Sequence, residues 1–417
     1  MIEHVMRPKL LTIALAALLV AAAGCGEGVD TTHVTSEAVT PLSRAPLSDA
    51  AAKRVVGVGE ATHGNKEFAQ TRKLIIQKLV REHGFRTVAL EADFGGTAEA
   101  DDYVMGGRGS AEDAAKALGF DIYRTRETAD LLRWIRDHNA TTPEEHDKVR
   151  LYGFDMQRYD HNKKRLLRYL AKAAPAVARQ TETSLAALTD ASRSKQPTER
   201  TIAAADHLVT HLKQDRAKYM NAGSPEEYTL ALHHAETIQH GAQLQTSAND
   251  YARKRDTWMA ENIKWITEAQ GRKNIVVAAH NSHLDKTGAA FSFESMGVHL
   301  TRTYGDDYFV IATEFGTNTF ISKDDGTGKR TRFTVTNDSP LAKLFGNEPL
   351  GYVNLTQAAT NPANRDLLTS KLPMGSIGDG FRSLYSSISR AYTVPTVPAD
   401  AYDALVFVPR ASPVSPL

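Results

Sequence analysis

The chain has 417 residues, 41% of them hydrophobic and 24% charged, so one large domain with an insertion, or two domains, is expected rather than disorder. Its formal net charge is +1 and its basic residues are scattered, which argues against nucleic-acid binding. A single cysteine, Cys25, excludes internal disulfides and a catalytic cysteine.

The first 25 residues are predicted to be an export signal of the lipoprotein type. An apolar run over residues 10–23 follows two basic residues and is too short for a comfortable membrane span. The run ends in "AAGC", which resembles a lipobox with Cys25 as the lipidated residue; cleavage of a plain signal is the alternative. We therefore expect an exported protein, at the cell surface or in the periplasm, that meets the membrane only through a lipid anchor at Cys25. Residues 26–48, rich in Thr, Ser, Gly and Pro, are expected to be a flexible tether.

Four apolar runs of strand length follow the tether, and their continuous hydrophobicity is typical of parallel strands covered on both faces. Between the first two runs, residues 65–84 carry apolar side chains at helical spacing and end in Gly84, a helix-stop signal, which gives a strand–helix–strand unit. The expected fold is therefore α/β, with a mainly parallel sheet, mixed at its edge, and helices on both faces. The four runs are residues 54–60, 87–93, 149–155 and 274–281.

A long interval without a convincing strand, residues 161–271, is predicted to be a helical insertion, broken at Pro175, Pro197 and Gly223. It separates two parts of the α/β core, residues 49–160 and 272–417. The histidines of the insertion are predicted to lie on solvated helix surfaces: His207, His211, His233, His234 and His240. Further strands are expected after it, the middle ones forming a hairpin at the sheet edge: 308–316, 319–323, 331–336 and 404–410.

Polar side chains stand at the ends of all four core strands. In a parallel sheet these carboxyl ends share one edge, which is where ligands bind in open α/β folds. Asp93, before Phe94, also fits the cap of a following helix. Because four strands end alike, we expect these side chains to converge on one site: Glu60 with His63, Glu91 with Asp93, Asp155, and His280 with His283.

Several common hydrolase motifs are absent. The sequence has no Gly-x-Ser-x-Gly elbow, no His-Glu-x-x-His and no phosphate-binding Gly-x-x-x-x-Gly-Lys-Ser/Thr loop. Hydrolysis would then proceed by direct attack of water, which needs a neutral imidazole, a carboxylate that orients it and donors for the developing oxyanion. Histidine suits the first role because its ordinary pKa lies near neutrality.

Six motifs in order resemble the erythromycin esterase family: "GEATHG" (59–64), "TR" (71–72), "LEADF" (90–94), "YGFDMQ" (152–157), "RDTWMAENI" (255–263) and "AHNSHL" (279–284). The resemblance implies a hydrolase with an α/β core and a helical insertion that forms one wall of a deep cleft. It also implies that water opens the lactone ring of 14-membered macrolide antibiotics, so that the expected partner is a small ester or lactone. This interpretation requires no cofactor, and the resemblance leaves a divalent metal open.

The resemblance assigns residues to this reaction. His63 matches the general base, and the other catalytic positions match Glu60, Arg72, Glu91, His280 and His283. Arg255, Asp155 and Glu261 are expected to contact the substrate.

Two alternatives remain. One is a metal-dependent hydrolase, perhaps a protease, in which a divalent metal is held by His63, Glu91, His280 and His283. The other is a non-catalytic lipoprotein that binds haem or another ligand; the acids and arginines at the strand ends argue against it, because a haem pocket needs mostly apolar walls.

Overall fold

The computed structural model describes residues 29–271 and 274–417, so Cys25 and the predicted export signal lie outside the described residues. The strands form a ten-stranded sheet and a two-stranded sheet. The large sheet contains β1 (Thr40–Pro41), β2 (Val55–Glu60), β3 (Thr87–Asp93), β4 (Arg150–Asp155), β5 (Ile275–His280), β6 (Tyr308–Asp324), β7 (Arg330–Thr336), β8 (Gly351–Asn354), β10 (Gly380–Phe381) and β12 (Ala404–Ala411). The small sheet pairs β9 (Leu372–Gly375) with β11 (Thr393–Thr396).

The large sheet is mostly parallel. Its strand order is β1-β8-β12-β6-β2-β5-β3-β4, and the six strands from β12 to β4 run parallel to their neighbours. β8 and β1 extend one edge in antiparallel fashion. The predicted fold class, a mainly parallel α/β sheet with a mixed edge, is therefore confirmed.

Both faces of the sheet are buried because successive side chains of the central strands point to opposite sides. Val56 and Val58 pack into one core, which α2 and α5 cover, whereas Val55 and Val277 pack into the other, beneath α11 and α13. The helices of these layers are α1 (Ser48–Ala51), α2 (Lys66–His83), α3 (Phe94–Val104), α4 (Ala111–Ala117), α5 (Arg126–Ala140), α11 (Tyr251–Ala269), α12 (Asn281–Leu284) and α13 (Met296–Tyr304).

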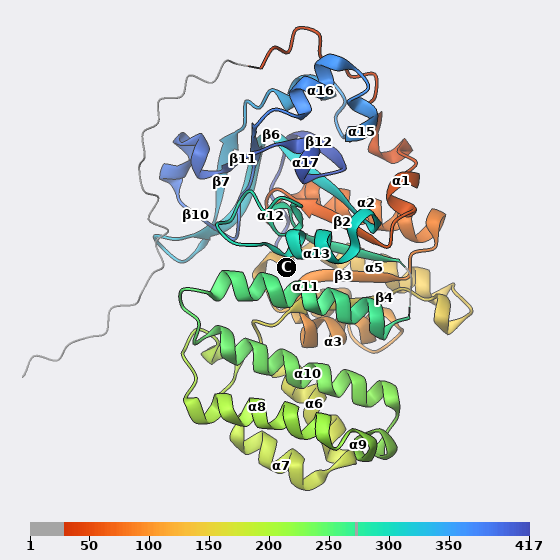
Figure 1. The fold of residues 1–417 in the computed structure, drawn as a ribbon, viewed down its shortest axis with the longest axis vertical. Coiled ribbons are helices and arrows are strands. Elements are labelled where there is room, and N and C mark those ends of the chain that lie inside the picture. The colour runs from red at the N-terminus through yellow and green to blue at the C-terminus, as the bar shows by residue number, and fades with distance from the viewer. Residues whose placement is uncertain (1–28, 272–273) are drawn as a thin grey trace, which may run out of the picture.

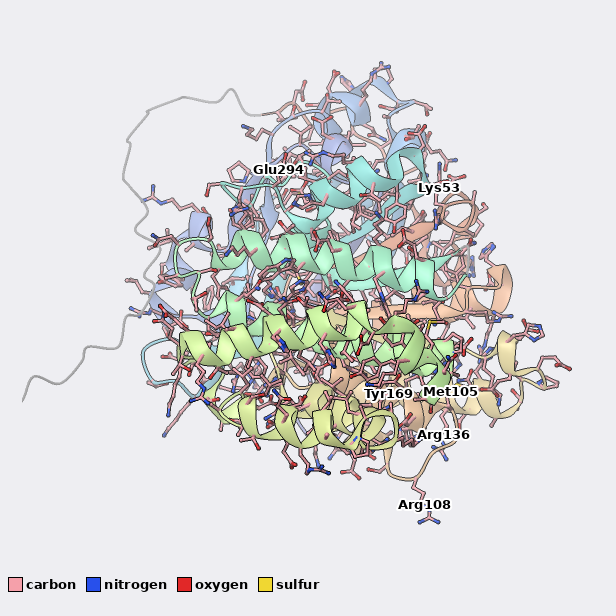
Figure 2. The ribbon with its side chains drawn as sticks, turned by 60° about the horizontal axis from the view of Figure 1, so that its bottom comes forward. Lys53, Met105, Arg108, Arg136, Tyr169 and Glu294 are labelled. Atoms are coloured by element: carbon pink, nitrogen blue, oxygen red, sulfur yellow. The ribbon has the colours of Figure 1, made fainter. Side chains whose placement is uncertain are left out.

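A group of helices fills the chain between β4 and β5 (Figure 1). It has a core of its own, which includes Leu166, Leu212 and Ile238. Tyr169, labelled in Figure 2, belongs to this core, and its hydroxyl donates a hydrogen bond of 2.8 Å to the carbonyl of Tyr219. In Figure 1, α11 runs between this group and the sheet. The group consists of α6 (Asp160–Ala173), α7 (Pro175–Ser184), α8 (Glu199–Gln214), α9 (Arg216–Ala222) and α10 (Pro225–Leu244).

The C-terminal part returns to the sheet with short elements. These are α14 (Leu341–Phe345), α15 (Leu355–Ala358), α16 (Pro362–Leu368) and α17 (Pro398–Ala401). Across residues 29–271 and 274–417, no helix combines the length and apolar character that crossing a membrane requires.

Three local expectations need correction. Residues 29–48 are not a free tether, because β1 pairs with β8 and the side chains of Leu42 and Leu47 are buried in the core. The runs at 308–316 and 319–323 form the single strand β6, and β7 pairs with its far end, so the hairpin extends a central strand. His233 and His234 are buried rather than solvated, because α10 packs between α6, α8 and α11.

Candidate active site

The ends of the parallel strands bring the predicted polar side chains to one edge of the sheet. Glu60 at the end of β2 is the register partner of His280 at the end of β5. Asp93 and Asp155 are likewise partners at the ends of β3 and β4. The convergence predicted from the strand ends therefore follows from the parallel topology.

Two glycines allow the turn after β2 to approach its neighbours closely. A Cβ atom added to Gly59 would lie 2.2 Å from Oδ1 of Asn281, and one added to Gly64 would lie 2.1 Å from the carbonyl oxygen of Ile321. Neither position has room for a side chain. These contacts fix the path of the turn that carries His63.

His63 is held through one ring nitrogen and leaves the other available. Its Nδ1 lies 2.8 Å from Oε1 of Glu60, whose Oε2 accepts a hydrogen bond of 3.0 Å from Nη1 of Arg72. The carboxylate acceptor makes Nδ1 the protonated nitrogen of the neutral ring. Nε2 has no hydrogen-bond partner among the described residues, and the side chain lines a cavity. The neutral ring can therefore accept a proton at Nε2.

Nearby charges favour the protonated form of His63 and the ionised form of Glu60. Burial opposes protonation of His63, but its hydrogen bond and ion pair with Glu60, together with the charge of Glu91, raise its pKa above the ordinary value. Burial also opposes ionisation of Glu60, yet Arg72 and His63 hold the pKa of this carboxyl below its usual value. His63 is therefore a stronger base than a free imidazole.

His280 is neutral and positions its neighbours. The backbone N–H of Ser282 donates to its Nδ1 at 3.2 Å, and its Nε2 donates to the carbonyl of Ala61 at 3.2 Å. Burial, with the nearby charges of His63 and His283, lowers the pKa of His280 to about 3. Its ring centroid lies 5.0 Å from that of His63. His280 thus ties β5 to the turn that carries the proposed base.

Arg255, on α11, links the helical layer to the ends of two strands. Its Nη2 donates to Oε1 of Glu91 (2.8 Å), and its Nε donates to Oδ2 of Asp155 (2.9 Å). Burial favours neutral side chains here, but the neighbouring charges outweigh it: Asp155 and Glu91 raise the pKa of Arg255. In the same way, His283 and Arg255 hold the pKa of Glu91 well below its usual range. The guanidinium is thereby fixed in one orientation.

His283 lies between Arg255 and Asp256. Its Nδ1 is 2.9 Å from Oδ1 of Asp256, and its Nε2 lies 3.2 Å from Nη1 of Arg255. Burial opposes protonation, but the charges of Asp256 and Glu91 raise the pKa of His283. Asp256 also accepts a hydrogen bond from the backbone N–H of Met296, which fixes it in place (3.0 Å).

The cavity at this edge, here called the site cavity, has a volume of about 380 Å³. That volume lies within the range of pockets that hold small molecules. Segments of the C-terminal part close it, because Ser376 follows β9 and Val394 belongs to β11. Its walls include His63, Gln157, Tyr251, Arg255, Asp256, His280, Ser282, His283, Phe291, Ser376 and Val394.

Some of the predicted site residues line the site cavity, others support those residues from behind, and Glu261 does neither. Those that line the site cavity are His63, Arg255, His280 and His283, and those that support them from behind are Glu60, Arg72, Glu91 and Asp155. Asp155 is fully buried and contacts Arg255, so it is not placed to touch a substrate as expected. Glu261 is exposed and does not line the cavity, because it lies six residues beyond Arg255 and faces another side of α11. Asp93 caps α3, as predicted, by accepting from the N–H of Gly96.

Some residues of the site carried no recognisable sequence signal. Asp256 was visible only as the neighbour of Arg255, in a pattern typical of a surface ion pair. Tyr123, whose hydroxyl donates to the carbonyl of Glu91 (3.0 Å), ends a 3₁₀ helix of three residues, Asp121–Tyr123. Ser282 and Ser376, which share a hydroxyl contact of 2.9 Å, come from segments 94 residues apart.

The four candidate metal ligands do not match a metal site as they are arranged. Both ring nitrogens of His280 are engaged by backbone groups, and both oxygens of Glu91 accept hydrogen bonds, from Arg255 and the N–H of His280. Within residues 29–271 and 274–417, no group of three or more His, Cys, Asp or Glu side chains is placed to hold a metal ion. The arrangement is instead one of proton donors and acceptors paired with each other.

Known proteins resemble this chain in sequence and in fold. A family model described as Erythromycin esterase matches residues 80–411, which include Glu91, Arg255, His280 and His283. Erythromycin esterase type II of Escherichia coli is 24% identical over 287 residues, covering 61% of this chain and 67% of that enzyme. A Bacillus cereus protein of known structure is 26% identical, with a TM-score of 0.78 over 92% of this chain and 95% of its own. An erythromycin esterase mutant in its open conformation shares the fold at 19% identity, with a TM-score of 0.65 over 87% of this chain and 92% of its own.

Proposed function

Because the chain belongs to the erythromycin esterase family, we propose that it hydrolyses an ester or lactone by direct attack of water, with His63 as the general base. Family membership supports a hydrolase with a small-molecule substrate. The observation that carries the finer proposal is the state of His63: Nδ1 is held by Glu60, Nε2 has no hydrogen-bond partner among the described residues, and the side chain lines the site cavity.

The reaction begins with water in the site cavity beside Nε2 of His63. Nε2 removes a proton as the water oxygen bonds to the ester carbonyl carbon, and Glu60 stabilises the imidazolium that forms. The proton then passes from His63 to the alcohol oxygen as the C–O bond breaks. The products are an acid and an alcohol, or a single ring-opened hydroxy acid from a lactone.

Arg255 supplies the positive charge for the developing oxyanion. Its guanidinium lines the cavity and is pinned by Glu91 and Asp155, so it needs little reorganisation during the reaction. Arg72, by contrast, does not line the cavity and supports Glu60 instead. We therefore assign Arg72 and His280 positioning roles.

A serine nucleophile is the main mechanistic competitor, and the contacts argue against it. Ser282 lines the site cavity, but its hydroxyl pairs with that of Ser376 and is not hydrogen-bonded to a histidine nitrogen. A serine nucleophile needs an adjacent base to accept its proton. Nδ1 of His280 already accepts the backbone N–H of Ser282.

The test is to incubate the lipid-free protein with 14-membered macrolides and simpler lactones and to follow the gain of one water by mass spectrometry. His63→Ala should slow hydrolysis by roughly 10²–10⁴-fold, the usual contribution of a general base. His207→Ala, on the exposed surface of α8, is the matched control and should keep the wild-type rate. A folded His63→Ala protein that kept the wild-type rate would refute the proposed base.

We also propose that this activity is located outside the cytoplasm, through the lipoprotein-type signal and the anchor at Cys25. Membrane fractionation of the full chain and of Cys25→Ser tests this location. The wild type should sediment with membranes, and the variant should not.

A further inference from the structure

A second and larger cavity adjoins His63. Its volume is about 620 Å³, and His63 lines both this cavity and the site cavity. We call it the arginine cavity, because three arginines form part of its wall. It is lined by His63, Asp121, Ile122, Arg124, Thr125, Ile321, Arg330, Thr331, Arg332, Val414, Pro416 and Leu417.

Two of the arginines lie on the same face of one strand. Arg330 and Arg332 stand two residues apart on β7, so their side chains leave the same face of the strand. Ile321, the register partner of Arg332 on β6, lines the cavity as well. Arg124 comes from a different segment, directly after the 3₁₀ helix η2 (Asp121–Tyr123).

The guanidinium groups outnumber the carboxylate side chains of the wall. Asp121 is the one acidic side chain in the lining, and it pairs with Arg124 at 3.0 Å. Arg330 pairs with Asp379, which is not part of the wall. Within residues 29–271 and 274–417, the exposed side chain of Arg332 has no ion-pair or hydrogen-bond partner. A cationic group on a ligand would therefore be repelled, whereas an anionic oxygen group would find an uncompensated guanidinium.

Part of the wall is apolar, while Thr125 and Thr331 add hydroxyl groups. Ile122, Ile321 and Val414 offer hydrocarbon surface between the arginines and His63. A ligand that matches this wall has an apolar body and an anionic end. Because His63 borders both cavities, such a body can extend from a carbonyl group beside the proposed base.

We infer that the arginine cavity binds an anionic oxygen group of the substrate, such as a carboxylate, and so selects esters or lactones that carry a negative charge away from the reacting carbonyl. This inference rests on the proposed function, since it takes His63 as the point of reaction. Arg332 is the principal contact, because Arg124 and Arg330 are already paired with Asp121 and Asp379.

A matched pair of esters tests the selection. 4-Nitrophenyl hydrogen adipate and 4-nitrophenyl hexanoate have acyl chains of equal length, but only the first ends in a carboxylate. The wild type should hydrolyse the adipate ester with a kcat/KM about tenfold higher or more, as one charge-assisted hydrogen bond provides. Arg332→Ala should remove most of this preference by lowering kcat/KM for the adipate ester towards the value for the hexanoate ester, while Arg332→Lys should restore part of it. Arg365→Ala, an exposed arginine on α16, is the matched control.

A measurement of ligand affinity tests this inference separately from the proposed hydrolysis. The 4-nitroanilides of the same two acids, titrated calorimetrically, report affinity without ester cleavage. About tenfold tighter binding of the carboxylate-bearing anilide, lost in Arg332→Ala, supports the inference. It does so even if neither ester is cleaved, because the absence of cleavage counts against the proposed hydrolysis and not against the binding of an anionic group. Equal binding of the two anilides, or a preference that Arg332→Ala leaves intact, overturns the inference.

Discussion

The pair of His63 and Glu60 makes a quantitative prediction for Glu60→Gln. The amide keeps the shape of the carboxylate but removes its charge. It also cannot accept from both neighbours: with its oxygen toward Nδ1 of His63, its NH₂ faces the donor Nη1 of Arg72. One buried charge-assisted hydrogen bond of this kind contributes about 1.5–3 kcal/mol.

That loss should appear in the pH dependence of the rate. In the wild type, kcat/KM should rise with pH as His63 loses its proton, at a pKa above the ordinary histidine value because of Glu60. In Glu60→Gln the protonated ring loses its partner, so the rising limb should move to lower pH by roughly 1–2 pH units, at 1.36 kcal/mol per unit. The plateau should fall about tenfold, because a weaker base removes the proton from water less effectively.

The assay is the pH profile of kcat/KM between pH 5 and 9 on one lactone or ester. Glu82→Gln is the matched control, because Glu82 is an exposed glutamate on α2 that pairs only with Lys78. Glu82→Gln should change neither the pH of the rising limb nor the plateau value of kcat/KM. If Glu60→Gln lowered neither the plateau nor the position of the limb, Glu60 would have no role in tuning the base.

Three further predictions follow from other contacts. Arg255→Met should lower the free energy of unfolding by about 3–5 kcal/mol, because Glu91 and Asp155 would stay buried without their partner; thermal melting, with the exposed Arg253→Met as control, measures it. Burial raises the pKa of Glu314 to about 7, so the free energy of unfolding should fall as pH rises from about 4.5 to 7 and the buried carboxyl has to ionise. The melting temperature of Glu314→Gln should therefore rise relative to that of the wild type over the same pH interval. Chelation with EDTA should leave the hydrolysis rate unchanged; loss of the rate with recovery on added zinc would favour the metal-dependent alternative.

The part of the site that the sequence predicts correctly depends on short-range order. Glu60, Glu91 and His280 each end an apolar run, so the parallel arrangement of those runs is enough to bring them to one edge. The fold class is predictable for the same reason, since continuous hydrophobic runs and helical spacing are local patterns.

The rest depends on contacts between distant segments. Asp256 acts on His283 only because α12 lies against α11, and nothing next to Asp256 in the chain indicates this. β1 is two residues long and becomes a strand by pairing with β8, more than 300 residues later, which is why the local sequence predicts a tether over residues 26–48. The prediction that Glu261 contacts the substrate is wrong for the opposite reason. Glu261 belongs to a recognisable motif, but helix geometry turns it away from the cavity.

The ion pairs of Arg255 also bear on how the protein can be divided. The guanidinium comes from α11, while its carboxylate partners come from β3 and β4, so the arrangement exists only when α11 is docked on the sheet. The isolated sheet would keep Asp155 buried at its edge without the guanidinium that pairs with it. A fragment that omits the helices between β4 and β5, α11 included, would therefore lose the Arg255 guanidinium and leave a buried carboxylate unpaired, which destabilises the sheet.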